Sequence, residues 1–148
     1  MVTNRLLSAQ QTARLGTWNE RSLRGLSKTQ QLVMEMEHHK VSVLVVTKTH
    51  IPDSGEMVLD ESKGYTMVFS GRQYGSTREG VGLALAPHAK ASLRCYQAMS
   101  SRILTGEFLT KVGPLLLVVV YAPQINLALR ARTYSTRIWK VSRPTQMG

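Results

Sequence analysis

The most constraining feature of this sequence is a continuous apolar run at residues 41–47, V-S-V-L-V-V-T. A run of this length that is rich in β-branched residues is typical of a strand that is covered on both faces. A second segment, A-R-L-G-T-W at residues 13–18, also predicts a strand. Because a segment with helical spacing separates the two, the sequence predicts a β-α-β start with both strands in one sheet.

The segment between these strands has the features of a helix. Ser27 and Gln30 have the spacing of a capping box, and Leu26 precedes them as a candidate hydrophobic staple. We therefore expect a helix from about Lys28 to His39. Its apolar positions share one face at i, i+1 and i+4 spacing: Leu32, Val33 and Met36.

The remaining pattern predicts strands and loops. Residues 53–64 are polar and predict a loop, and residues 71–80 form a second loop rich in glycine, serine and charge. Pro87 and His88 predict a turn of the chain, and Gly113–Pro114 predicts a tight turn between two strands. Further strands are expected at residues 65–70, 81–86, 93–96, 103–112 and 115–121. One helix followed by hairpin-linked strands predicts an α+β fold with a mostly antiparallel sheet.

Positive charge is concentrated at the C-terminus of a chain whose formal net charge is +10. Residues 125–148 contain five basic residues and no acid, whereas residues 1–124 contain 14 basic and 9 acidic residues. Such a balance favours polyanionic partners, because each neutralised phosphate releases counterions. The alternative is a charge that only keeps the protein in solution. Weak, non-specific nucleic-acid binding is expected from the tail residues Arg130, Arg132, Arg137, Lys140 and Arg143.

The composition predicts neither secretion nor a membrane partner. The longest apolar run, residues 115–122, is far too short to span a bilayer, and the N-terminus lacks the apolar segment of a signal peptide. The single Cys95 cannot form an internal disulfide, and we interpret it as a small apolar residue in a strand rather than a reactive thiol. These features predict an intracellular protein, nuclear or cytoplasmic.

Five short motifs follow one another in order: L-G-T-W-N at 15–19, V-V-T-K-T-H at 45–50, G-V-G-L-A-L at 80–85, S-S-R-I-L at 100–104 and V-V-V-Y-A-P at 118–123. Together they resemble the N-terminal half of the endonuclease/exonuclease/phosphatase superfamily, in particular its retrotransposon-endonuclease-like and craniofacial development protein 2-like branch. On this resemblance, residues 1–12 are an N-terminal arm and residues 13–123 a truncated superfamily domain. Residues 124–148 are a divergent, weakly ordered basic tail with a short helix around Leu127–Arg132.

The resemblance implies a four-layer αββα sandwich, of which this chain is expected to form half, with one sheet and its helical layer. It also implies cleavage of phosphoesters, often in DNA, with Mg²⁺ and an activated water. Asn19 and Tyr121 are then the candidate catalytic and phosphate-binding residues: Asn19 orients metal-site groups and the phosphate, and Tyr121 lies at the phosphate. The structural alternatives are an asparagine that closes a turn and an aromatic residue that ends a strand.

This chain departs from the superfamily pattern at the position of the metal ligand. Lys48 stands where the usual E-T-H stretch carries its acid, and an ammonium group has three donors and no acceptor, so it cannot bind a metal. Glu20 is a candidate partner for Lys48, because both follow strand ends. His50 keeps its position in the motif, although a histidine in a turn is the favoured interpretation.

A second departure concerns the C-terminal half of the superfamily domain. Its G-D-F-N-like and S-D-H-like stretches, which the resemblance associates with further acids and the general base, do not occur in this sequence. We therefore expect a phosphodiesterase-like fragment with impaired catalysis that does not bind Mg²⁺. The open alternatives are a nuclease completed by another chain, a non-enzymatic nucleic-acid-binding protein, and a pseudogene product without selected function. An uncovered sheet face is also expected, as a candidate surface for association.

Overall fold

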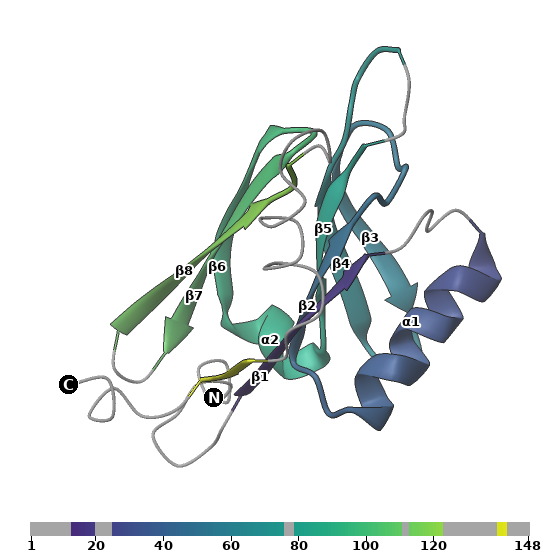
Figure 1. Cartoon of the computed structure of the whole chain (residues 1–148). Coiled ribbons are helices and arrows are strands. Elements are labelled where there is room, and N and C mark those ends of the chain that lie inside the picture. The colour runs from purple at the N-terminus through teal and green to yellow at the C-terminus, as the bar shows by residue number, and fades with distance from the viewer. Residues whose placement is uncertain (1–12, 20–24, 76–78, 111–112, 123–138, 142–148) are drawn as a thin grey trace.

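Two β-sheets face each other in the computed structural model, and one helix covers the outer face of the larger sheet (Figure 1). The structure describes residues 13–19, 25–75, 79–110, 113–122 and 139–141. In chain order the elements are β1 (Ala13–Asn19), α1 (Leu26–His38), β2 (Val43–Thr47), β3 (Ser54–Asp60), β4 (Tyr65–Ser70), β5 (Val81–Leu85), α2 (Pro87–Ser92), β6 (Leu93–Ser100), β7 (Ile103–Thr110), β8 (Gly113–Val120) and β9 (Trp139–Val141).

The first sheet has the strand order β3-β4-β5-β2-β1-β9, and the second sheet has the order β6-β7-β8. Strands β1 and β2 are parallel neighbours, whereas the other neighbouring pairs that the structure describes are antiparallel. The predicted α+β class, the mostly antiparallel pairing and the β-α-β start in one sheet are therefore confirmed. The expectation of a single sheet with its helical layer is wrong, because residues 93–120 form a second sheet.

The second sheet forms because its strands present an apolar face to the inner face of the first sheet. Leu104, Phe108 and Val119 pack in one cluster with Leu83 and Leu85 of β5. Burying a leucine or phenylalanine side chain contributes roughly 1.5–3 kcal/mol, which favours a second layer over an exposed extension of the first sheet. The sequence pattern predicted these strands correctly but not the layer that they form.

The central strands of the first sheet are covered on both faces. Side chains of β2 alternate between two clusters: Val43 packs toward the second sheet, whereas Leu44 and Val46 pack under α1. All five residues of β5 are buried. The prediction that the run at 41–47 is a strand covered on both faces is therefore confirmed.

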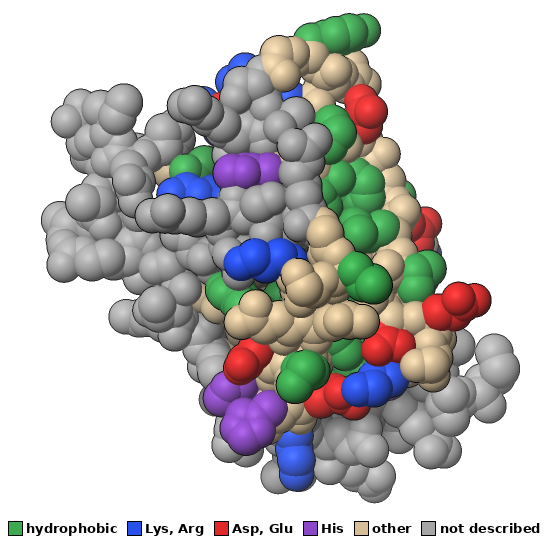
Figure 2. Space-filling view, turned by 90° about the vertical axis from the view of Figure 1, so that its right-hand side faces the viewer, with side chains coloured by type: hydrophobic (Ala, Val, Ile, Leu, Met, Phe, Trp, Pro, Cys, Tyr) green, Lys and Arg blue, Asp and Glu red, His purple; other side chains and the backbone are tan. Residues whose placement is uncertain are grey.

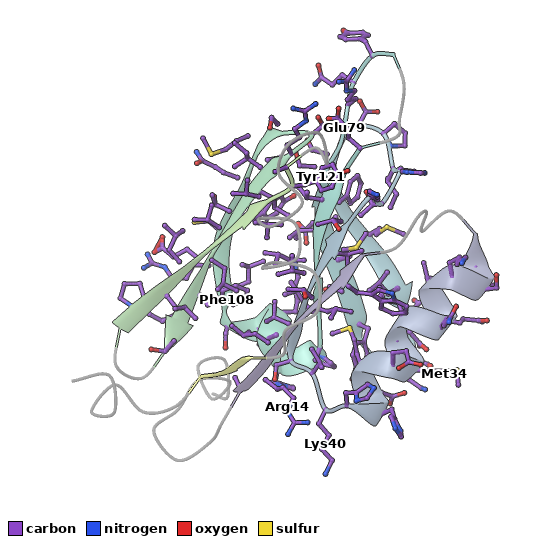
Figure 3. The ribbon with its side chains drawn as sticks, viewed as in Figure 1. Arg14, Met34, Lys40, Glu79, Phe108 and Tyr121 are labelled. Carbon is purple, nitrogen blue, oxygen red and sulfur yellow. The ribbon has the colours of Figure 1, made fainter. Side chains whose placement is uncertain are left out.

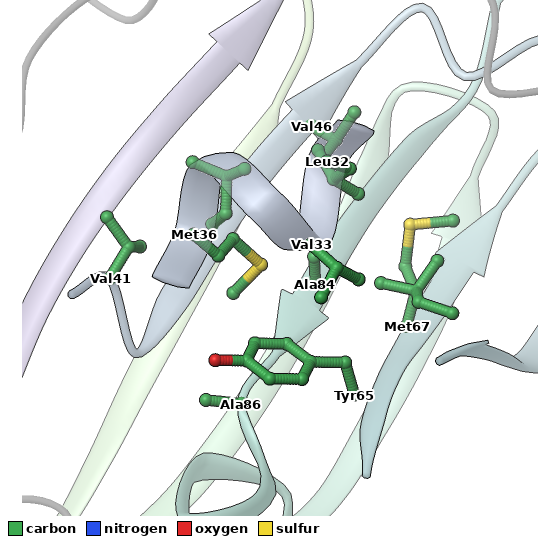
Figure 4. Packing of buried hydrophobic residues seen from close by; sticks show 11 residues of the cluster. Leu32, Val33, Met36, Val41, Val46, Tyr65, Met67, Ala84 and Ala86 are labelled. Atoms are coloured by element: carbon green, nitrogen blue, oxygen red, sulfur yellow. The ribbon is translucent and has the colours of Figure 1, made fainter. Parts of the chain in front are cut away.

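Helix α1 buries the face that its sequence predicts. Leu32, Val33 and Met36 are fully buried and pack in one cluster with Tyr65 and Met67, as Figure 4 shows. This helix is the outer layer of the first sheet.

The predicted start of α1 is wrong. The helix begins at Leu26 with Gly25 as its N-cap, and no side chain caps it. Ser27 therefore lies inside the first turn, where its hydroxyl is not placed to cap the helix end. The Thr29 hydroxyl instead donates a hydrogen bond to the Leu26 carbonyl oxygen at 2.9 Å. Leu26 is exposed and does not act as a hydrophobic staple.

The predicted polar loop at residues 53–64 is also wrong, because residues 54–60 form the edge strand β3. An edge strand needs an apolar contact on only one face, and Leu59 and Met57 provide it by packing in the cluster under α1. The other positions are polar or exposed, so the strand has the composition of a loop.

The structure differs from the sequence prediction at two turns. Pro87 begins the short helix α2 instead of a simple turn, at a position where its missing N–H group costs no helical hydrogen bond. Thr110 pairs with Gly113, so Gly113–Pro114 begin strand β8 instead of forming the predicted turn. Cys95 lies in β6, in a strand as predicted, and its side chain is exposed.

The face of β8 that points away from the first sheet is apolar. Leu116, Val118 and Val120 are exposed along this edge strand. Association through this face stays a prediction.

The predicted tail contributes one short strand to the fold. Residues 139–141 form β9, which pairs with β1 so that Lys140 is opposite Arg14. The N-terminal arm at 1–12, the predicted helix around Leu127–Arg132 and the rest of the tail lie outside the described residues.

Neither of the two helices that the structure describes is both long and apolar enough to cross a lipid bilayer.

Candidate functional site

The ends of β1 and β2 bring two predicted site positions together. The strands run parallel, and Asn19 is the register partner of Thr47, one residue before Lys48. The backbone of Asn19 therefore lies close to the 47–50 turn. The side chain of Asn19 and the whole of Glu20 lie outside the described residues, so the role of Asn19 and the Lys48–Glu20 pair stay predictions.

The turn that carries Lys48 and His50 is held in place by the start of β5. Both residues have a left-handed backbone, with φ of 58° and 56°. The Thr49 N–H group donates to the Gly80 carbonyl at 3.3 Å, and the His50 N–H group donates to the Glu79 carbonyl at 3.1 Å. Thr49 is completely buried against Gly80, whose φ is 124° and where an added Cβ would clash with the Thr49 hydroxyl. The backbone position of Lys48 is therefore fixed by packing.

The second sheet brings Tyr121 to the same place. The Gly80 N–H group donates to the Ser101 carbonyl at 3.2 Å, and the Tyr121 N–H group donates to the Arg102 carbonyl at 2.9 Å. The Lys48 Nζ lies 6.0 Å from the centre of the Tyr121 ring. This distance is at the limit of a cation–π interaction, which contributes about 0.5–1 kcal/mol at exposed sites. Lys48 and Tyr121, which the sequence singled out separately, are thus neighbours.

Glu79 is the carboxylate beside this turn, and the sequence analysis missed it. Arg72 Nη2 donates to its Oε1 at 2.8 Å, and Arg102 donates from Nη2 to Oε1 at 3.1 Å and from Nε to Oε2 at 3.3 Å. The Ser101 hydroxyl donates to Oε2 as well. The hydrogen bonds from Arg102 and then Ser101 are the main reason that the pKa of Glu79 falls from 4.5 to about 2.

We call Lys48, Arg72, Glu79, Arg102 and Tyr121 the strand-end cluster, because they lie where strands of both sheets begin or end. Figure 3 places Glu79 and Tyr121 close together at one end of the molecule and Lys40 at the opposite end. Three cations and one carboxylate give the cluster a formal charge of +2. The only sequence signal for Glu79 was its position in R-E-G just before a strand, which does not identify its partners.

The strand-end cluster does not fit the Mg²⁺ ion that the resemblance implies. Mg²⁺ is bound through carboxylate oxygens and water, but Lys48 offers only donors, and Glu79 already accepts from two arginines. Across the described ranges there is no group of three or more histidine, cysteine, aspartate or glutamate side chains that could hold a metal ion. His50 is half-buried in the turn and belongs to no such group.

An open groove with a volume of about 440 Å³ adjoins the cluster. It runs between the loop that follows β4 and the end of β6. Tyr74 is 85% exposed and Met99 is 63% exposed, so an exposed aromatic and an exposed apolar side chain line the groove together with Arg72. Its lining residues are Ser54, Ser70, Gly71, Arg72, Gln73, Tyr74, Ala98, Met99, Ser100 and Ser101.

Acidic side chains gather elsewhere on the molecule. Figure 2 shows the side of the molecule that carries α1, where several red acidic side chains lie in the lower half near blue and purple basic ones and others lie higher on the right. Glu37 of α1 pairs with Lys63 at 2.7 Å, and Glu56 of β3 pairs with Lys90. A polyanion would therefore meet less repulsion at the strand-end cluster than at α1 and β3. Of the predicted tail cations, the structure describes only the backbone of Lys140, in β9.

Comparison with known proteins supports the fold. No family model matches the sequence. No curated protein matches it either. Solved structures resemble the chain, and three of them are endonucleases or endonuclease domains. The AP endonuclease LMAP from Leishmania major has a TM-score of 0.59 and 19% identity over 84% of this chain and 44% of its own. An AP endonuclease from Archaeoglobus fulgidus has a TM-score of 0.52 and 18% identity over 76% of this chain and 42% of its own.

The third is the endonuclease domain of TRAS1, a telomere-specific non-LTR retrotransposon, with a TM-score of 0.53 and 14% identity over 83% of this chain and 53% of its own. This chain thus spans about half the length of the structures that it matches. At these identities the likeness concerns the fold alone. The chain has an endonuclease-like fold, consistent with the superfamily that its motifs resemble.

Proposed function

We propose that this chain is a nucleic-acid-binding protein on an endonuclease-like fold, and that it lacks Mg²⁺-dependent phosphodiester hydrolysis. The observation that carries the proposal is the fixed position of Lys48. Packing and hydrogen bonds of the turn hold a cation where the resemblance implies a metal-binding acid, and the neighbouring carboxylate of Glu79 is shared by two arginines. Metal-assisted hydrolysis needs a bound metal ion, and the described residues include no group of three or more histidine, cysteine, aspartate or glutamate side chains that could hold one.

The groove beside the strand-end cluster supports nucleic acid as the ligand. Base stacking on an exposed aromatic side chain next to basic groups is a common way to bind single-stranded nucleic acid without sequence preference. Tyr74 and Arg72 offer these two groups on one rim of the groove. The tail residues Arg130, Arg132, Arg137, Lys140 and Arg143 would add contacts to phosphates, which makes binding weak, non-specific and strongly dependent on salt.

Two measurements on the purified chain test this function. Fluorescence anisotropy with a labelled DNA oligonucleotide at low salt should show saturable binding, and supercoiled plasmid should remain intact with Mg²⁺. Absence of binding would refute the binding function. Metal-dependent nicking that Asn19→Ala abolishes would refute the claim of impaired catalysis and would confirm the role that the resemblance gives to Asn19.

A further inference from the structure

We propose that Lys48 and Tyr121 form a phosphate-binding site that needs no metal ion. This inference rests on the proposed function and adds to it: the Lys48 ammonium contacts a backbone phosphate directly, in the place of the Mg²⁺ ion. The ligand is a phosphate group, and the experiment below separates free phosphate from the phosphates of nucleic acid.

The turn that carries Lys48 is rigid. A lysine on a flexible loop spends little time at any one place, but the backbone of Lys48 is held between the end of β2 and the buried Thr49. Hydrogen bonds from Thr49 and His50 to the residues before β5 prevent the turn from moving independently of the first sheet. The left-handed φ of Lys48 departs from the geometry of the preceding strand, and its side chain extends toward Tyr121 of the second sheet.

The positive charge of Lys48 also favours an anionic ligand. In the part of the chain that the structure describes, Lys48 has no carboxylate partner, whereas Lys63 and Lys90 each pair with one. Glu79 does not fill this role, because Arg72, Arg102 and Ser101 already donate to both of its oxygens. Lys48 is half-buried as a residue, and its ammonium group, 6.0 Å from the centre of the Tyr121 ring, retains donors for an incoming anion.

The side chains of Lys48 and Tyr121 together suit a phosphate group. A phosphate oxygen accepts hydrogen bonds from an ammonium and from a phenol, and Lys48 and Tyr121 provide one of each. The Tyr121 ring limits the directions from which a ligand can approach the ammonium. Because Arg72 and Arg102 are charged and exposed nearby, the adjoining phosphates of an oligonucleotide would also meet positive charge.

The test is an NMR titration of the ¹⁵N-labelled full chain with inorganic phosphate in EDTA, against chloride at equal ionic strength. We expect saturable shifts of the amide signals of residues 48–50 and Tyr121, which Lys48→Gln abolishes and Lys48→Arg retains. The matched control is Lys40→Gln, because Lys40 also has a left-handed backbone (φ of 54°) but lies at the opposite end of the molecule. It should leave the titration unchanged.

A labelled oligonucleotide forms the second arm. Lys48→Gln should lower its affinity in EDTA and reduce the slope of log affinity against log salt by about 0.7–0.9, the value for one lost phosphate contact, whereas Lys40→Gln should not. Phosphate shifts that are absent, or that persist in a folded Lys48→Gln variant, would overturn the site. Phosphate binding without oligonucleotide binding would confirm the site and refute only the proposed function.

Discussion

The two ends of the sandwich differ in how their charged side chains are paired. At the end where α1 finishes, Lys63 and Glu37 form a one-to-one pair at 2.7 Å, with nearly half of each side chain exposed. At the other end, Arg72 and Arg102 share the single carboxylate of Glu79, and Lys48 has no carboxylate partner among the described residues. The Lys63–Glu37 pair at the first end is neutral and solvated, whereas the strand-end cluster retains a positive charge.

This difference shows how a binding surface can be told from an ordinary charged surface. Exposed one-to-one ion pairs are screened by water and contribute little to stability. A carboxylate that accepts from two guanidinium groups instead fixes those groups in place without cancelling their combined charge. The strand-end cluster is therefore rigid and cationic at once, which are the two properties that a phosphate site needs.

The largest expected effect on nucleic-acid binding comes from the basic residues of the tail. Their charge adds to that of the two ends compared above. Replacing Arg130, Arg132, Arg137 and Arg143 together by glutamine should reduce the slope of log affinity against log salt by up to about 3–4, because each lost phosphate contact removes about 0.9. Lys140 is kept because it lies in β9. Anisotropy titrations over a salt series measure this slope. An unchanged slope would show that the tail does not contact nucleic acid.

Charge reversal at Lys48 should have the next largest effect. Lys48→Glu should weaken oligonucleotide binding in EDTA on the order of tenfold at low salt, because a phosphate contact becomes a repulsion. It should also increase the affinity for Mg²⁺, measured by calorimetry, without producing plasmid nicking. Lys40→Glu makes the same charge change at the other end and should have a much smaller effect. If Lys48→Glu and Lys40→Glu lose the same oligonucleotide affinity, the two ends of the molecule do not differ in their contribution to binding.

Replacing Glu79, whose carboxylate is shared by two arginines, should lower stability more than replacing Glu37, which forms an exposed one-to-one pair. The fall of the Glu79 pKa from 4.5 to about 2 corresponds to about 3 kcal/mol, which solvent screening reduces to about 1–2 kcal/mol. Glu79→Gln should lower the free energy of unfolding in urea by this amount, whereas Glu37→Gln should change it little. A Glu79→Gln variant as stable as the unaltered chain would show that the carboxylate does not hold the two arginines.

The same carboxylate predicts a pH dependence. Because its pKa is lower in the folded than in the unfolded state, the stabilisation from Glu79 is fully present above about pH 4.5 and is lost as the pH falls toward about 2. The stability difference between the unaltered chain and Glu79→Gln should therefore be constant near neutral pH and shrink below about pH 4.5. The lowered pKa of Asp60, caused first by the Lys63 N–H group, is common to both proteins and cancels in this difference. A difference that does not change with pH would exclude the ionised carboxylate as its cause.

The sequence could predict elements whose pattern is local. The spacing of Leu32, Val33 and Met36 identifies the buried face of α1, and the apolar run at 41–47 identifies a central strand. The meeting of Asn19 with Thr47 follows from two parallel strands that end at the same edge. Each of these predictions uses only the spacing of apolar residues within one segment and the rule that strands joined by a helix lie in one sheet.

The sequence could not predict contacts that depend on the packing of the two sheets. Glu79 meets Ser101 and Arg102 more than twenty residues away, only after the second sheet has folded onto the first. The same packing brings Tyr121 to Lys48. Edge strand β3 was missed for another reason, because a strand with one apolar contact face has few apolar residues.

The most direct test of the central claim is the affinity of the unaltered chain for a DNA oligonucleotide in EDTA and in Mg²⁺, at constant ionic strength. If Lys48 holds the phosphate in place of a metal ion, binding in EDTA should be at least as tight as in Mg²⁺, because divalent cations only compete for the phosphates. Binding that requires Mg²⁺, or that becomes markedly tighter when Mg²⁺ replaces EDTA, would contradict the account.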